Sequence, residues 1–199
     1  TEYTPLQRET NGDKIVTQYD MYTVGEDGVG LLKMDFLGLR NLTIIEETLK
    51  FILENKNKKI DLSSVPLDDK KTYDLLSDAE TTGIFQLESA GMRRYIKDLR
   101  PSSIFDLMAM VALYRPGPMA NIPEFISRKR DSSRIKLPDP RLKDALAQSY
   151  GMLVYQDDVL LTTIAIAGYN WLDADKFRKA MGKKIPADMK KQKEQFIKG

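Results

Sequence analysis

The sequence predicts an α+β chain in which a small sheet edge comes first and a mainly α-helical domain follows. Residues 14–20 (KIVTQYD) and 29–36 (VGLLKMDF) are short runs rich in Val, Ile, Leu and aromatic residues. The turn signal GEDG lies between them, so they are expected to be neighbouring strands of one sheet. From Asn41 onward the apolar residues recur at helical spacing instead. We place the boundary at residue 60, which divides the chain into 1–60 and 61–199.

The helical part is expected as a series of short pieces. The first helix runs from Asn41 to about Asn57, where the polar run NKNKK ends it. The helix at 102–114 is so apolar that we expect it to be buried on most sides, and the RPGP motif ends it. Asp173 is expected at or near the N-cap of its helix. Helices are expected at 41–57, 70–76, 89–99, 102–114, 122–130, 140–149, 157–167, 172–181 and from Pro186 onward.

The composition excludes several classes of chemistry. The 199 residues include no Cys and no His. This rules out disulfides, Cys/His zinc sites, Cys or His nucleophile–base pairs and the Ser-His-Asp arrangement. A metal would have to be held by carboxylates, which favours Mg²⁺ or Mn²⁺. No apolar run approaches the ~20 residues of a membrane span, and the polar start TEYTPLQRET has no signal-peptide core. A start without Met leads us to expect a longer parent protein.

Charge is distributed unevenly along the chain. Residues 1–88 hold 10 Lys and Arg against 17 Asp and Glu, whereas residues 89–199 hold 21 against 12. The net charges are therefore −7 and +9, which together give the overall +2. A basic half favours an anionic partner, with nucleic acid the leading candidate, and a solvated basic surface is the alternative.

Asp35 is the candidate metal ligand. It ends the second expected strand, in GLLKMDFLGLRNLTII, just before a Gly-containing turn into a helix. A carboxylate at the rim of a sheet can hold a metal on a rigid support. The alternative is an ordinary turn aspartate that accepts hydrogen bonds from nearby backbone N–H groups.

Basic motifs in the second half are candidates for phosphate contacts. In YRPGPM (114–119), two prolines and a glycine would present Arg115 on a stiff loop, and a purely structural helix-breaking loop with an incidental surface Arg is the alternative. GMRRYIKDLR (91–100) interleaves cations with an aromatic, and helical spacing would put Arg93, Lys97 and Arg100 on one face. RKAMGKK (178–184) gathers cations at a helix end, where favouring the helix dipole is the simpler explanation. In YQDDV (155–159), the paired acids fit helix capping better than metal binding.

Taken together, these motifs resemble the bacterial DNA polymerase III alpha subunit, the C-family of replicative DNA polymerases. KMDFLGLRNLTII, TTGIFQLESAGMRRYIKDLRP, ALYRPGPM and LVYQDDV followed by FRKAMGKK occur in the order and at the spacing typical of that family. The resemblance extends over nearly the whole chain, and the combination is far more specific than any one motif.

The resemblance implies that 1–60 is the end of a polymerase-beta-like palm and 61–199 the fingers. It implies a palm with three aspartates holding two Mg²⁺ ions, of which Asp35 matches the third, catalytic one. It implies primer–template DNA, dNTP, the sliding clamp and other replisome subunits as partners, and a bacterial cytoplasmic, nucleoid-associated setting without a membrane. The positions it implies for nucleotide or DNA binding are Arg115, Arg178, Lys183, Lys184, Arg93, Arg94, Lys97, Tyr155 and Gln156.

One departure limits what the chain is expected to do alone. No Asp-x-Asp precedes Asp35 on an apolar strand, and the matching spacing of Asp173 and Asp175 falls at a helix start. We therefore expect that these 199 residues do not polymerise DNA by themselves. Two alternatives stay open: a non-catalytic DNA-binding or subunit-contact module derived from the fingers, and a basic scaffold that binds no DNA.

Overall fold

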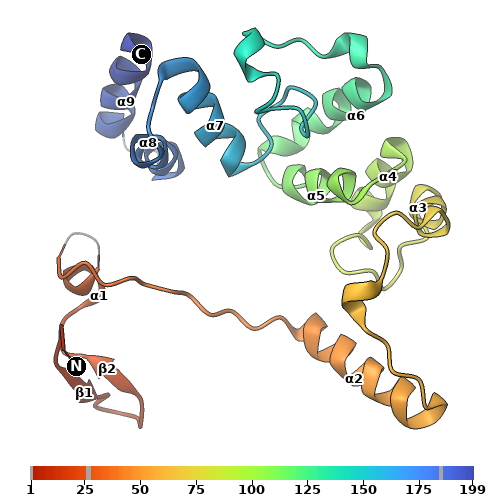
Figure 1. The fold of residues 1–199 in the computed structure, drawn as a ribbon, viewed down its shortest axis with the longest axis horizontal. Coiled ribbons are helices and arrows are strands. Elements are labelled where there is room, and N and C mark those ends of the chain that lie inside the picture. Colours follow the sequence, from red (N-terminus) through yellow and green to blue (C-terminus); the bar gives the residue numbers. More distant parts are fainter. Residues whose placement is uncertain (1, 26–27, 184–185) are drawn as a thin grey trace. The chain divides into compact units, whose positions relative to one another are not determined.

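A computed structural model describes residues 2–25, 28–183 and 186–199, and the chain divides into two compact units (Figure 1). Unit 1 is Thr1–Ile60 and unit 2 is Asp61–Gly199. Within the described residues, unit 1 holds a two-stranded antiparallel sheet and unit 2 is built from helices. This confirms the predicted α+β class with a mainly helical second part. In the described ranges no helix is both long and apolar enough to cross a membrane.

The sheet of unit 1 pairs β1 (Leu6–Arg8) with β2 (Ile15–Thr17), with Gln7 opposite Val16. The second strand falls inside the predicted run 14–20. The prediction of a partner strand at 29–36 was wrong, because the described residues there make no strand ladder. An apolar run becomes a strand only where a neighbour satisfies its backbone, and the polar LQR gave no signal of being that neighbour. The predicted GEDG turn includes residues 26–27, which lie outside the described residues.

Two helices belong to unit 1. The short α1 (Met21–Val24) begins at Asp20, whose carboxylate accepts from the N–H groups of Tyr22 and Thr23. The longer α2 (Arg40–Lys56) ends where Asn57 adopts a left-handed conformation, with φ 51°. Asn tolerates this conformation better than most residues, so NKNKK ends the helix as predicted.

Unit 2 contains one large apolar core. It is formed by α3 (Lys70–Ser77), α4 (Ala90–Leu99), α5 (Ile104–Leu113) and α6 (Ile122–Arg130). Short 3₁₀ turns connect them: η1 (Leu62–Ser64), η2 (Pro118–Asn121), η3 (Ser132–Arg134) and η4 (Pro140–Leu142). The fully buried residues of this core include Met92, Ile96, Leu99, Met110, Leu113, Ile122 and Phe125.

A second, smaller core lies among the C-terminal helices, drawn in blue in Figure 1: α7 (Gln156–Ala167), α8 (Trp171–Lys183) and α9 (Pro186–Lys198). Ala167, Tyr169 and Ala174 are its buried centre. The rings of Phe177 and Phe196 pack against Tyr169 with centroids 6.1 and 6.4 Å away. Pro186 begins α9, as its fixed φ predicted.

One local expectation needed correction. Residues 140–149 form η4 and turns rather than an α-helix, because the N–H groups of Leu142 and Lys143 bond three residues back instead of four. α5 is buried or half-buried on most sides, as predicted, and its exposed positions are Phe105 and Met108, at 48% and 50%. Asp173 lies near the start of its helix, as predicted: it is in the first turn of α8, and the side chain of the preceding Asn170 accepts from its N–H.

Candidate nucleic-acid interface

The RPGP loop is held in the shape that its sequence predicted. Gly117 adopts φ 104° and ψ −75°, a conformation that residues with a Cβ avoid, and Pro118 begins η2. The backbone carbonyl of Arg115 accepts from the N–H of Met119 at 3.2 Å. The Arg115 side chain is exposed and makes no hydrogen bond or ion pair to another described residue. It is therefore a cation available for an anionic partner.

The base of this loop packs against the start of α4. A Cβ on Gly91 would lie 2.1 Å from the hydroxyl oxygen of Tyr114, so any larger residue at position 91 would have to displace the end of this ring. The ring of Tyr114 also meets that of Tyr95 edge-on, with centroids 6.0 Å apart. The backbone next to Arg115 thus has a fixed position relative to α4.

Of the four cations that the sequence placed on or next to α4, two are exposed without a partner, one is bonded to a backbone carbonyl and one ends the helix. Arg94 and Lys97 lie on the exposed side and make no hydrogen bond or ion pair in the described part of the chain. Arg93 is half-buried and donates from Nε to the carbonyl of Ala79 at 2.9 Å. Arg100 ends the helix with φ 48°. The predicted face of Arg93, Lys97 and Arg100 was therefore wrong, because the helix stops before Arg100.

The structure brings Gln156 and Arg178 together. Arg178 donates from Nη1 to Oε1 of Gln156 at 3.4 Å, and from Nε and Nη2 to Oδ1 of Asp175 at 2.9 and 2.6 Å. Hydrogen bonds from Arg178 and Lys179 hold the pKa of Asp175 below its usual value. The charge of Arg178 is thus already partly compensated by Asp175, a partner that we did not predict.

Tyr155 and Asp158 organise the start of α7. The Asp158 carboxylate accepts from the N–H groups of Val154 and Tyr155 at 2.7 and 2.8 Å. Burial nevertheless outweighs these bonds and raises the pKa of Asp158. This confirms, for Asp158, the prediction that the acids of YQDDV cap a helix. Tyr155 packs half-buried against the large core, and burial raises its pKa as well. Its edge, with Gln156 and Asp157, lines an open cavity of ≈ 590 Å³.

Asp35 lies in the irregular segment between α1 and α2, not at the end of a strand. Its side chain is 82% exposed and forms an ion pair with Lys33, with 3.1 Å between Nζ and Oδ1. Among the described residues there is no group of three or more acidic side chains that could hold a metal ion. Lys183 is the last residue of α8, and Lys184 lies outside the described residues. The roles predicted for all three stay predictions.

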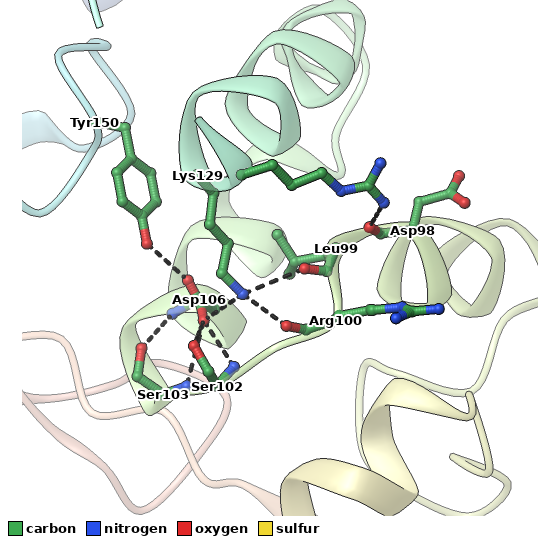
Figure 2. Close-up of polar contacts among 9 residues, drawn as sticks. Asp98, Leu99, Arg100, Ser102, Ser103, Asp106, Lys129 and Tyr150 are labelled. Carbon is green, nitrogen blue, oxygen red and sulfur yellow. Dashed lines mark hydrogen bonds and ion pairs between the residues drawn. The ribbon is translucent and has the colours of Figure 1, made fainter. Parts of the chain in front are cut away.

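The most elaborate polar group of unit 2 was not predicted. Figure 2 shows Asp106 at the first turn of α5, in contact with Lys129 of α6 and Tyr150. We call these residues, with Ser102 and Ser103, the Asp106 cluster. Asp106 is 2% exposed. The capping pair of Ser103 and Asp106 was readable from their spacing, whereas nothing local marked Lys129 as its partner.

These features define a helical domain that exposes unpaired cations beside a rigid, proline-bounded loop, which suits a nucleic-acid or nucleotide phosphate. Comparison with known proteins gives the family. Residues 41–199 match the bacterial DNA polymerase III alpha subunit finger domain, and the chain belongs to this family.

The relatives extend the similarity to the whole chain. It is 46% identical over 199 residues to the DNA polymerase III subunit alpha of Bacillus subtilis, and 43% identical over 204 residues to that of Thermus aquaticus. The subunit of Xylella fastidiosa is 46% identical over 208 residues. All three alignments cover 100% of this chain but only 16–18% of the relative. The chain thus spans less than a fifth of the curated relatives it matches.

Proposed function

We propose that the chain is the palm-edge and fingers portion of a DNA-directed DNA polymerase that extends a primer in the bacterial cytoplasm. The similarity of the entire chain to DNA polymerase III alpha subunits carries this proposal. In it, unit 2 binds the incoming dNTP and the template, and the rest of the intact subunit brings the sliding clamp and other replisome proteins.

The exposed cations of unit 2 support this role. Arg94, Lys97 and Arg115 have no acidic partner among the described residues, so binding a phosphate breaks no existing ion pair. Arg178 differs because Asp175 holds its guanidinium from one edge. We assign Arg94 and Lys97 to the DNA backbone, and Arg178 with Gln156 to the nucleotide or the templating base.

Asp35 would supply one ligand to catalytic Mg²⁺. A carboxylate oxygen is the donor type that Mg²⁺ prefers, and Asp35 is exposed enough to reach an ion. A single carboxylate is one donor and not a complete site, which agrees with the lack of a three-acid group in the described residues. When bound, two such ions would activate the primer hydroxyl and neutralise the leaving pyrophosphate. The further carboxylates would have to come from elsewhere in the intact protein, so these 199 residues alone should not polymerise.

A second candidate, a non-catalytic DNA-binding or subunit-contact module derived from the fingers, accounts equally for the lack of a three-acid group in the described residues. The polymerase and the DNA-binding form of the module both predict DNA binding, and only the polymerase predicts that Asp35 is needed for primer extension.

DNA binding by the 199-residue chain tests what both candidates share. If Arg94 and Lys97 each contact a backbone phosphate, Arg94→Ala/Lys97→Ala should reduce the slope of log affinity against log salt by about 1.8 on duplex DNA. The matched control is Lys58→Ala/Lys59→Ala, which removes the same charge from exposed positions of unit 1. Equal slopes for the two double variants would contradict the assignment of α4 to the DNA backbone.

A further inference from the structure

The last turn of α6 carries three consecutive cations that point to other parts of unit 2. Arg128 donates from Nη1 to the carbonyls of Tyr150 and Gly151 at 3.2 and 3.0 Å. Lys129 donates to two carbonyls at the end of α4 (Figure 2). Arg130 donates to the carbonyl of Asp98. The side chains of Arg128 and Lys129 are only 15% and 12% exposed. All three cations of this run are thus engaged by backbone carbonyls of unit 2, Arg128 and Lys129 mostly buried and Arg130 at the surface.

Lys129 fixes the end of α4. Its ammonium lies 3.2 Å from the carbonyl oxygen of Leu99 and 2.6 Å from that of Arg100. Carbonyls in the last turn of a helix have no partner within the helix, and a cation is favourable there. The same ammonium lies 2.9 Å from Oδ2 of Asp106. One side chain of α6 therefore joins the end of α4 to the start of α5.

Asp106 extends this connection to the turn before α7. Its Oδ2 accepts from the N–H groups of Ser102 and Ser103 at 2.8 and 3.2 Å, and its Oδ1 accepts from the hydroxyl of Tyr150 at 3.2 Å. Tyr150 adopts φ 51° and Gly151 φ 74°. A bulky residue keeps a left-handed conformation only where its surroundings determine it. Here the hydroxyl is held by Asp106 and the carbonyl by Arg128.

We propose that Lys129 is a positioning residue for DNA binding: through the Asp106 cluster it fixes the cations of α4 relative to the turn that leads into α7. The inference rests on the proposed function, because that function places DNA or nucleotide contacts on both segments. Arg94 and Lys97 lie on the helix that Lys129 caps, and Gln156 begins the helix that follows the Tyr150 turn. Without the cluster, Arg94 and Lys97 would remain exposed, but α4 would no longer be held in place relative to the Tyr150 turn. DNA would then have to fix this arrangement on binding, which would weaken its affinity.

In the intact protein, the test compares Asp106→Asn/Lys129→Met with Asp68→Asn/Lys136→Met, a control at exposed positions that leaves the net charge unchanged, as the first double variant does. The double variant leaves no buried charge unpaired, so the fold should survive. We expect hydrogen exchange to rise together in 98–104 and 149–156 without rising in α9. We also expect DNA affinity at fixed salt to fall about tenfold, with a salt slope that changes by less than the ~0.9 of one lost phosphate contact. The control should keep both the exchange pattern and the affinity.

Each other outcome would overturn the inference. Wild-type affinity in the folded double variant would mean that the cluster is only structural. A slope reduced by a full phosphate contact would mean that Lys129 touches DNA itself. Exchange that rises in only one of the two segments would mean that the cluster does not couple them. An intact wild-type protein that does not bind DNA would instead remove the proposed function, and this role with it.

Discussion

Replacing Lys129 with Met should destabilise unit 2 more than almost any other single substitution of a charged residue. The change keeps an unbranched side chain that reaches to Cε but removes the ammonium, whose Nζ lies 2.9 Å from Oδ2 of Asp106. The carboxylate of Asp106, only 2% exposed, would then be buried without its cation. Leaving one partner of a buried ion pair alone costs about 3–5 kcal/mol.

The assay is urea unfolding followed by far-ultraviolet circular dichroism. With a slope of about 2 kcal/mol per molar urea, the loss should lower the midpoint by about 2 M. Trp171, the one tryptophan in the sequence, is the first residue of α8 and is 66% exposed, so its fluorescence reports on that helix separately from the large core. Coincident transitions would show that the two cores unfold together.

A double-mutant cycle isolates the pair itself. Asp106→Asn added to Lys129→Met removes the unpaired charge and should recover about 2 kcal/mol of the loss. The reasoning would be refuted if Lys129→Met alone cost less than about 1 kcal/mol, since a surface ion pair typically costs no more than that. It would also be refuted if the two substitutions were simply additive.

The other predictions concern pH, backbone and the nucleotide. Hydrogen bonds from Ser102 and the charge of Lys129 outweigh burial and hold the pKa of Asp106 below 3.8. The ionised Asp106 therefore stabilises the fold above pH 3.8, and this stabilisation is lost as the pH falls through the lower pKa of the folded state. The free energy of unfolding should consequently fall less steeply with acidification in Asp106→Asn than in wild type. Burial raises the pKa of Asp158. Its protonated form therefore favours the folded state, and this stabilisation is lost as the pH rises from about 3.8 through the higher pKa of the folded state. Asp158→Asn should weaken this loss of stability with rising pH, and an unchanged pH profile of unfolding would contradict the argument. Gly117→Ala should cost more than about 1 kcal/mol in urea unfolding because φ is 104°, whereas Gly182→Ala inside α8 has open space and should be neutral or stabilising. In the intact protein, Arg178→Ala should raise KM for dNTP at least about tenfold, the loss of a charge-assisted contact, and an unchanged KM would remove Arg178 from the nucleotide site.

Local signals in the sequence predicted most helices of unit 2. Pro186 begins α9 as predicted, and the predicted helices at 89–99 and 102–114 are α4 and α5, whose caps Ser89 and Ser103 the structure adds. Capping and proline geometry depend on neighbouring residues alone. The same holds for Gly117, whose place between two prolines required an unusual φ. Where a signal and its structural cause lie within a few residues, sequence reasoning was sufficient.

Features that depend on distant partners were not predictable in this way. Lys97 and Lys129 are both helical lysines near other cations, yet only Lys129 meets a buried carboxylate, 23 positions away in the sequence. Arg178 was predicted as a phosphate contact without its partner Asp175. Residues 29–36 have the composition of a strand, but a strand also needs a neighbour to accept its hydrogen bonds. Tertiary packing decides each of these cases, and a single sequence does not display it.

Primer extension by the intact protein, with Asp35→Asn compared with wild type, tests the central claim most directly. Asn keeps the size of the side chain and removes the charge that Mg²⁺ would need, so folding and DNA binding should persist and serve as controls. The polymerase proposal predicts that extension falls by several orders of magnitude while DNA affinity is retained. Extension close to wild type would show that Asp35 is not a catalytic ligand, and would favour a fingers-derived module that binds DNA without catalysing its synthesis.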